Sequence, residues 1–297
     1  MMKRSGIVLV TGAAGRLGQA MLMHGLGGSR LHGADLEPCT AGVERCDITR
    51  SEDVAAALDG VQAVVHAAAL HAPHVGLVSE RRFMQVNVDA TRRLYEMAAE
   101  RGVSRFVFLS STAVYGAAAT PTGRAGWVDE SLDPKPRTIY HRSKLIAEAW
   151  LQAQCRSGGP AVRILRVARC FPEPAHLMAV YRLHRGVDAR DVARACAMSL
   201  GDTLGPFRRW IIAAPTPLQR SDVLELHADA ATVLARRAPR LVIAMQRRGW
   251  PLPVSIDRVY DASRVGRELG WRARHGAISV LRDADHSNPR VLPPVAC

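Results

Sequence analysis

The stretch Ile7-Val8-Leu9-Val10-Thr11-Gly12-Ala13-Ala14-Gly15-Arg16-Leu17-Gly18 decides the fold of this chain. Its four strong apolar residues predict a buried strand, and a glycine-rich turn with the spacing G-x-x-G-x-x-G then leads into a helix. Gly12 permits the tight turn, Gly15 lets backbone amides approach a pyrophosphate, and Gly18 lets the helix pack closely on the strand. The N-terminus of that helix adds partial positive charge for the phosphates. A strand, this turn and a helix together predict a dinucleotide site.

Asp35 indicates which dinucleotide binds, because it ends the next predicted strand, 20 residues after Gly15. Its carboxylate can accept hydrogen bonds from both ribose hydroxyls of NAD and would repel the 2′-phosphate of NADP. Arg16 lies in the turn, where its guanidinium could meet that phosphate, so NADP stays open. Asp47 follows another short strand and either bonds the adenine amino group or is an N-cap or turn residue. We expect NAD as the cofactor.

The rest of the first 170 residues alternates short apolar runs with helical stretches. The predicted strands are Gly6–Val10, Arg30–Asp35, Ala63–His66, Arg105–Leu109 and Val162–Val167. The predicted helices cover residues 15–26, 51–58, 79–101 and 138–156. Strands that alternate with helices form parallel βαβ units, so we expect an α/β fold with a doubly wound parallel Rossmann sheet.

After Pro172 the alternation loosens, which predicts a second and smaller part. We expect a helix over residues 189–200, a strand over Trp210–Ala213 and helices over 221–236 and 262–269. Asp188 and Asp191 are interpreted as helix-start carboxylates. The predicted division is an NAD-binding Rossmann domain at 1–170 and a smaller substrate-binding region at 171–297, whose tail from Ser287 is expected to fray.

Composition excludes several classes of protein. The 297 residues are 48% hydrophobic and 23% charged, as in ordinary soluble globular chains, which excludes disorder, collagen-like repeats and coiled coils. The net charge is +13, but only three of the 40 basic residues are lysines and the arginines are scattered, so we expect no nucleic-acid partner. No apolar run approaches the roughly 20 residues that cross a bilayer. We therefore expect a cytoplasmic protein with no membrane partner.

Tyr140 and Lys144 form a second candidate motif, because a spacing of four places both on one face of a helix. The strand Arg105–Leu109 runs into Ser111, which puts a hydroxyl at the carboxyl end of a parallel strand. A free tyrosine has a pKa of about 10, which an adjacent ammonium and a cationic nicotinamide ring would lower. We predict that Tyr140 takes the proton from a substrate hydroxyl while hydride passes to NAD, that Ser111 holds the substrate oxygen, and that Lys144 also binds the nicotinamide ribose.

Further motifs follow the glycine turn in order. They are Asp35, Asp47-Ile48, His66-Ala67-Ala68-Ala69, Asn87-Val88, Ser110-Ser111-Thr112-Ala113-Val114-Tyr115-Gly116 and Tyr140-His141-Arg142-Ser143-Lys144, with Glu148 after them. On these residues the chain resembles the extended short-chain dehydrogenases/reductases, the NAD-dependent epimerase/dehydratase family.

The resemblance implies roles residue by residue. Ser111 matches the active-site hydroxyl, Tyr140 the catalytic base and Lys144 its partner. Positions that match cofactor contacts are Gly12, Gly15, Arg16, Leu17, Gly18, Asp35, Asp47, Ile48, Ala67 and Ala68. Asn87 matches a residue that shapes the nicotinamide pocket, or is an internal polar group of its helix. The resemblance also implies a homodimer paired through a four-helix bundle of the helices at 79–101 and 138–156.

The segment after strand Val162–Val167 bears on the substrate. Nucleotide-sugar epimerases of the family usually carry an Arg-x-x-Asn-x-Tyr-Gly-Pro-like segment here, whereas this chain reads Arg166-Val167-Ala168-Arg169-Cys170-Phe171-Pro172-Glu173-Pro174. The asparagine and glycine are missing. The Cys-Phe-Pro-Glu-Pro string is similar to the uronate dehydrogenases, yet the next four residues include no arginine to seat a substrate carboxylate. We expect a small sugar, sugar acid or polyol-like substrate.

Candidate substrate contacts are His71, Thr112, Arg169 and Phe171. His71 and His74 have no third ligand in sight, so we expect no metal there. The alternative to a substrate contact is an ordinary structural role in the loop. Arg169 could meet a phosphate or a carboxylate. The alternative function is a nucleotide-sugar epimerase or dehydratase that recycles its NAD internally. A non-catalytic dinucleotide sensor would be expected to lack the serine, tyrosine or lysine.

Overall fold

The computed structural model describes residues 6–38, 42–288 and 291, so most of the predicted frayed tail lies outside the described residues. The chain divides into two compact units that alternate along the sequence. Unit 1 comprises Met1–Val114, Pro136–Arg166 and Val192–Trp210, and unit 2 comprises Tyr115–Lys135, Val167–Asp191 and Ile211–Cys297. The sequence suggested a single boundary after residue 170. In the structure, the chain passes between the two units several times.

Unit 1 is built on a seven-stranded sheet with the order β3-β2-β1-β4-β5-β7-β8. The strands are β1 (Ile7–Thr11), β2 (Arg30–Asp35), β3 (Val43–Arg45), β4 (Val61–His66), β5 (Arg105–Ser111), β7 (Ala161–Val167) and β8 (Phe207–Ile212). The pairings of β1 with β2 and β4, of β2 with β3 and of β4 with β5 are parallel. This arrangement confirms the predicted doubly wound α/β fold.

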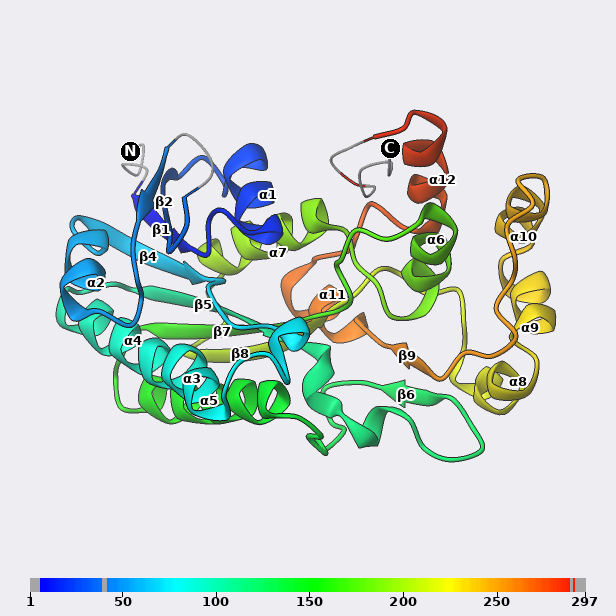
Figure 1. Cartoon of the computed structure of the whole chain (residues 1–297), viewed down its shortest axis with the longest axis horizontal. Coiled ribbons are helices and arrows are strands. Elements are labelled where there is room, and N and C mark those ends of the chain that lie inside the picture. Colours follow the sequence, from blue (N-terminus) through cyan, green and yellow to red (C-terminus); the bar gives the residue numbers. More distant parts are fainter. Residues whose placement is uncertain (1–5, 39–41, 289–290, 292–297) are drawn as a thin grey trace. The chain divides into compact units, whose positions relative to one another are not determined.

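Helices cover the faces of this sheet, with α1 and α7 on one face and α4 and α5 on the other (Figure 1). The helices are α1 (Arg16–His24), α2 (Ser51–Ala57), α3 (Glu80–Met84), α4 (Ala90–Glu100), α5 (Ile139–Arg156) and α7 (Ala189–Gly201). A π-helical turn at Gln85–Asp89 joins α3 to α4, so the single helix predicted over 79–101 contains one wider turn. The fully buried Leu9, Phe106 and Leu151 mark the core between the sheet and α4 and α5.

Unit 2 consists of short helices around a small sheet of β6 (Gly126–Val128) and β9 (Arg258–Tyr260), which pair in parallel. Its helices are α6 (Ala175–His184), α8 (Val223–Ala228), α9 (Ala230–Arg237), α10 (Pro239–Gln246), α11 (Ser263–Leu269) and α12 (Ala277–Asp285). The helix predicted over 221–236 is broken at Asp229, whose side chain accepts from the backbone N–H of Thr232 and caps α9. The sequence did not predict α6, α10, α12 or the two short strands.

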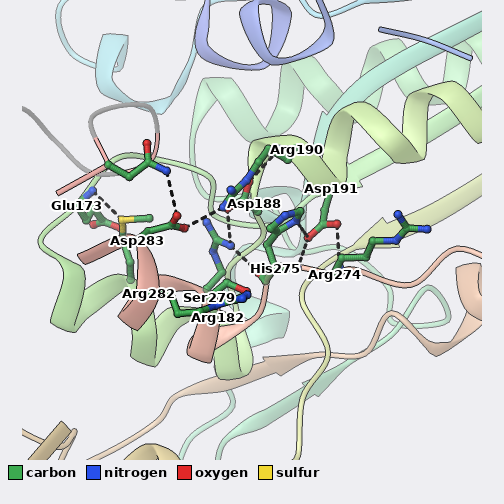
Figure 2. A network of polar contacts seen from close by, with 12 residues as sticks. Glu173, Arg182, Asp188, Arg190, Asp191, Arg274, His275, Ser279, Arg282 and Asp283 are labelled. Carbon is green, nitrogen blue, oxygen red and sulfur yellow. Dashed lines mark hydrogen bonds and ion pairs between the residues drawn. The ribbon is translucent and has the colours of Figure 1, made fainter. Parts of the chain in front are cut away.

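Buried ion pairs hold α6, the start of α7 and α12 together (Figure 2). Asp188 accepts from Arg182 at 3.0 Å and from Arg190 at 2.9 Å, and Arg190 also reaches Asp283 of α12 at 2.9 Å. Burial raises the pKa of Asp188, but Arg190 and Arg182 together hold that pKa well below its usual range. Interpreting Asp188 as only a helix-start carboxylate was therefore wrong, because it also binds two arginines.

Asp191 has a similar second role. Its carboxylate accepts the backbone N–H groups of Arg274 and His275, each at 2.8 Å (Figure 2). Its backbone carbonyl accepts from the indole of Trp271 at 3.2 Å. The segment that leads into α12 is thus fixed to the first turn of α7. Interpreting Asp191 only as a helix-start residue missed this contact, which joins positions more than 80 residues apart.

Two further findings concern the helices and the cysteines. In residues 6–38, 42–288 and 291, no helix combines the length and the apolar character that a membrane span requires. Cys46, Cys155, Cys170 and Cys196 are free thiols.

Candidate active site

The glycine turn between β1 and α1 has the geometry that the spacing predicted. Gly12 has φ +70°, and a Cβ placed on it would lie 2.6 Å from the backbone N of Ala68. A Cβ on Gly18 would lie 2.2 Å from the carbonyl oxygen of Gly12. Side chains at these two positions would therefore collide with backbone. The glycines at both positions are required for the close approach of the strand, the turn and the helix.

Gly15 lies at the N-cap of α1 and is exposed. A Cβ there would meet only the carbonyl of Gly12, at 3.3 Å, so the absence of a side chain leaves the N-terminal amides of α1 open to a ligand. Those amides and the helix dipole favour an anionic group. The turn therefore fits the pyrophosphate of a dinucleotide.

Asp35 lies beside this turn at the end of β2. Its Oδ2 accepts from the backbone N–H of Ala14 at 2.9 Å, and its Oδ1 accepts from that of Glu37 at 3.2 Å. The two contacts hold the half-buried carboxylate next to the glycine turn, where a ribose would follow the pyrophosphate. Arg16 and Leu17, in the first turn of α1, are half-buried.

Asp47 fits the turn alternative. Its carboxylate accepts from the backbone N–H of Thr49 at 2.9 Å and from the hydroxyl of Thr49 at 2.7 Å. Burial raises the pKa of Asp47, but the two bonds from Thr49 more than offset it and hold the pKa below its usual range. Ile48 is buried in the core of unit 1. Contacts of both residues with the cofactor stay predictions.

Ala67 and Ala68 follow β4 and lie against the glycine turn. The backbone N–H of Ala67 donates to the carbonyl of Thr11 at 3.1 Å, and that of Ala68 donates to the Thr11 hydroxyl at 3.3 Å. The two alanines thus pass beside the end of β1, as the predicted cofactor contact requires.

The structure brings Ser111, Tyr140 and Lys144 together at the carboxyl end of β5. Ser111 ends that strand and shares a hydrogen bond with the hydroxyl of Tyr140, which lies in the first turn of α5. One turn later the ammonium of Lys144 donates to the carbonyl of Leu109 at 2.9 Å and lies 4.6 Å from the centre of the Phe108 ring. Tyr140 is 6% exposed and Lys144 2%. A tyrosine, a serine and a buried amine in this arrangement can transfer a proton to or from a bound hydroxyl group.

Burial dominates the electrostatics of this group. It raises the pKa of Tyr140, which the hydrogen bond from Ser111 lowers only in part. It lowers the pKa of Lys144 to about 7, against the attraction of Glu148. The sequence argument expected the ammonium to lower the pKa of Tyr140, and the structure differs here because removing both groups from water disfavours both charged forms.

A buried ion pair lies behind Lys144. Glu148, one turn further along α5, accepts from Arg166 of β7 at 2.7 Å and from the hydroxyl of Ser110 at 2.5 Å. The side chains of Glu148 and Arg166 are each 2% exposed. Sequence reasoning did not assign Arg166 or Ser110 a role. The two arginines inside the apolar run Val162–Val167, Arg163 and Arg166, were the available signal, because a buried guanidinium needs a carboxylate partner.

Asn87 lies in the π-helical turn and is 1% exposed. Its amide donates to the carbonyl of Leu70 and to the hydroxyl of Ser143, each at 3.0 Å, and its Oδ1 accepts from the backbone N–H of Leu70 at 2.8 Å. Both hydrogens of the amide are used, so these contacts fit the internal polar group that was the alternative. A role in shaping the nicotinamide pocket stays a prediction.

Two of the candidate substrate residues lie in unit 1. The His71 ring centre is 6.3 Å from that of Tyr140, and the backbone N–H of His71 donates to Nδ1 of His74 at 2.9 Å. Thr112 is buried in the turn that follows Ser111. Across the described ranges, no three His, Cys, Asp or Glu side chains gather closely enough to hold a metal ion.

Arg169 and Phe171 belong to unit 2. The guanidinium of Arg169 binds Glu173 through Nε at 2.7 Å and through a terminal nitrogen at 2.5 Å, and it lies 5.3 Å from the centre of the Phe171 ring. The prediction that Arg169 meets a substrate anion therefore competes with a bidentate carboxylate already in place. The sequence did not reveal Glu173 as this partner, because residues 169–173 are not helical and the i, i+4 spacing therefore predicts no contact there.

Comparison with known proteins places these features among relatives. A family model described as "NAD dependent epimerase/dehydratase family" matches residues 8–179. The NAD-dependent glucose-6-phosphate dehydrogenase of Haloferax volcanii is 31% identical over 159 residues, which cover 48% of this chain and 60% of that protein. The chain thus spans less than two thirds of the length of this curated relative.

Solved structures share the fold over nearly the whole chain. A short-chain dehydrogenase/reductase superfamily protein from Agrobacterium tumefaciens with bound NAD gives a TM-score of 0.71, at 21% identity over 96% of this chain and 97% of that one. The UDP-glucose 4-epimerase of Thermus thermophilus in complex with NAD gives a TM-score of 0.69, at 21% identity over 94% of this chain and 98% of that one. At these identities the likeness is one of fold.

Proposed function

The chain belongs to the NAD-dependent epimerase/dehydratase family, and on that premise we propose that it is an oxidoreductase that removes hydride from a hydroxyl-bearing carbon of a small sugar, sugar acid or polyol-like substrate. Membership of this family agrees with NAD, the cofactor that the glycine turn and Asp35 predicted. The observation that carries the proposal is the hydrogen bond between the hydroxyls of Tyr140 and Ser111, with Lys144 buried one turn away.

Each residue of this group has a defined task in the proposed reaction. Gly12, Gly15 and Asp35 hold the dinucleotide, which accepts hydride at its nicotinamide ring when bound. The Ser111 hydroxyl holds the substrate oxygen, and the phenolic oxygen of Tyr140 takes the proton from the substrate hydroxyl. Lys144 binds the nicotinamide ribose and stabilises the phenolate that forms on Tyr140.

The raised pKa of Tyr140 sets a condition on this task. The phenolate must be stabilised by positive charge at the moment the proton moves, and the Lys144 ammonium supplies it from the same face of α5. Because the pKa of Lys144 is lowered to about 7, the charged form that helps Tyr140 is already in part lost near neutral pH. The two groups therefore have to be treated as a coupled pair.

The size of the substrate is inferred from the segment after β7. Arg169 is bound by Glu173, and Pro172 and Pro174 have no backbone N–H to offer a diphosphate. The Haloferax volcanii relative is a glucose-6-phosphate dehydrogenase, so a sugar without a nucleotide is a known substrate among relatives. The second candidate function, an epimerase or dehydratase that recycles NAD, is favoured by the fold shared with the Thermus thermophilus UDP-glucose 4-epimerase.

Calorimetry on the NAD-loaded protein separates the two candidates. We expect free UDP and TDP to bind weakly or not at all. Micromolar binding of either nucleotide would contradict the small substrate and make the epimerase or dehydratase the better proposal. The homodimer paired through α4 and α5 and the cytoplasmic location also stay predictions, and light scattering on the purified protein tests the first.

A further inference from the structure

A chain of buried hydrogen bonds starts at the end of β1, beside the glycine turn. Nδ1 of His66 lies 2.7 Å from the hydroxyl of Thr11, and Nε2 of His66 lies 3.0 Å from the hydroxyl of Thr91. All three side chains are 1% exposed. His66 ends β4 and Thr91 lies in the first turn of α4, so the imidazole joins the last residue of β1 to a helix on the face of the sheet.

The directions of these bonds follow from counting protons. Thr91 has one hydroxyl proton, which it donates to the backbone carbonyl of Asn87 at 2.9 Å. His66 must then donate to Thr91 through Nε2–H, which leaves Nδ1 as an acceptor for the hydroxyl proton of Thr11. The lone pairs of Thr11 remain free to accept the backbone N–H of Ala68. Only one neutral tautomer of His66 satisfies every partner.

From Asn87 the chain of bonds continues to the catalytic helix. The Asn87 amide donates to the hydroxyl of Ser143 at 3.0 Å, and Ser143 donates to the backbone carbonyl of Tyr140 at 2.9 Å. Asn87 lies in the π-helical turn, a wider turn of the kind that recurs at functional sites. Through the covalent bonds of Asn87 itself, these contacts connect the strand that ends in the glycine turn to the backbone of the residue proposed as the base.

We propose that His66 and Thr91 are positioning residues, which fix the backbone of Tyr140 relative to the glycine turn. This inference rests on the proposed function, because it gives the two residues a purpose only if Tyr140 acts on a substrate beside a dinucleotide bound at Gly12. Both side chains are 1% exposed and bonded inside the protein, so we assign them an action through other residues and no direct contact with substrate or cofactor. Their effect is on distance and orientation, to which proton and hydride transfer are highly sensitive.

Burial explains why the chain of bonds behaves as one unit. Each group has lost its contact with water, so the loss of one partner leaves others without a hydrogen bond. Burial also lowers the pKa of His66 to about 3, with a smaller contribution from Lys144. The imidazole thus stays neutral at working pH, and the directions of the bonds do not change with pH in that range.

A matched pair of substitutions tests the inference. Thr91→Val removes the hydroxyl and keeps the shape of the side chain, whereas Thr91→Ser keeps the hydroxyl. We expect turnover of the folded Thr91→Val variant to fall at least about tenfold, with its affinity for NAD within about twofold of wild type. Thr91→Ser is expected to retain most of the turnover. Thermal unfolding of both variants separates this effect from a loss of folded protein.

A measurement on the wild-type protein covers the case in which Thr91→Val does not fold. Nitrogen-15 NMR of labelled histidine, with the His66 signal assigned by its loss in His66→Gln, is expected to show the Nε2–H tautomer and no titration between about pH 5 and pH 8. The Nδ1–H tautomer or a titrating signal would overturn the inference. So would wild-type turnover in folded Thr91→Val. If Tyr140→Phe also kept full turnover, the proposed function itself would fail, and the two failures are thus distinguishable.

Discussion

One buried connection in unit 1 and one in unit 2 join distant segments with different chemistry. In unit 1 the connection from β1 to α5 runs through neutral groups. They are the hydroxyls of Thr11, Thr91 and Ser143, the imidazole of His66 and the amide of Asn87. In unit 2 the connection between α6, α7 and α12 runs through charges, the carboxylates and guanidiniums of Asp188, Arg182, Arg190 and Asp283.

The difference assigns different properties to these two connections. Neutral groups keep their hydrogen bonds over the range of working pH, which suits a site whose geometry has to stay fixed. A buried ion pair adds little net stability, but breaking it leaves a charge without a partner, which is strongly unfavourable. Substitutions in this charged network of unit 2 are therefore expected to act mainly on stability, and those in the neutral chain of hydrogen bonds in unit 1 mainly on catalysis.

The largest expected effect is on the stability of unit 2. Asp188→Ala leaves Arg182, which is 3% exposed, and Arg190 without their shared carboxylate. We expect the free energy of unfolding to fall by about 3–5 kcal/mol, the range for breaking a buried pair. Urea denaturation measures it. Asp229→Ala, which removes an exposed cap, is the control and should cost about 1 kcal/mol; equal losses in the two variants would contradict the account of the buried network.

The next effect is on catalysis in unit 1. Tyr140→Phe removes one hydroxyl, so folding and NAD binding should survive while turnover falls by about 10² or more, as expected for the loss of a general base. Steady-state kinetics on a substrate found by NADH absorbance measures this. Wild-type turnover in the variant would remove the assignment of Tyr140 as the base.

A smaller effect concerns the choice of cofactor. Because its carboxylate lies beside the glycine turn, Asp35 should make NAD bind at least about tenfold tighter than NADP, or roughly 1.4 kcal/mol. Asp35→Ala should narrow the difference, chiefly by weakening NAD. Titration of both dinucleotides tests this, and equal affinities in the wild type would mean that Arg16 binds the 2′-phosphate.

The smallest effect is a pH dependence of stability at Lys144. Its folded-state pKa of about 7 lies below the ordinary value of 10.5, so the unfolded chain binds more protons between these two values. Stability therefore rises with pH in that window, and the contribution of Lys144 grows by about 1 kcal/mol between pH 7 and pH 8. Unfolding free energies of wild type and Lys144→Met, compared at both pH values, measure it. A difference that does not change with pH would show that Lys144 titrates normally.

The sequence predicted unit 1 far better than unit 2, for a physical reason. The strands and helices of unit 1 bury regular apolar patterns, and the candidate site residues Gly12, Asp35, Ser111 and Tyr140 lie where a strand ends or a helix begins. Such positions can be recognised locally.

The parts that the sequence did not predict depend on partners far apart along the chain. Arg182 and Arg190 look like surface residues until the fold brings the carbonyl of His275 beside Arg182 and the carboxylate of Asp283 beside Arg190. The π-helical turn was not predicted for the same reason, because it depends on contacts with distant residues. Its wide geometry places the Asn87 amide against Leu70 and Ser143, and no pattern within residues 79–101 predicts those contacts.

Net formation of NADH is the measurement that tests the central claim most directly. The wild-type protein, supplied with NAD and an active small sugar, sugar acid or polyol, is expected to release one NADH for each substrate molecule oxidised, and Tyr140→Phe is expected to release almost none. Consumption of substrate by the wild-type protein without any accumulation of NADH would contradict the claim, because it would mean that hydride returns to the product as in an epimerase or dehydratase.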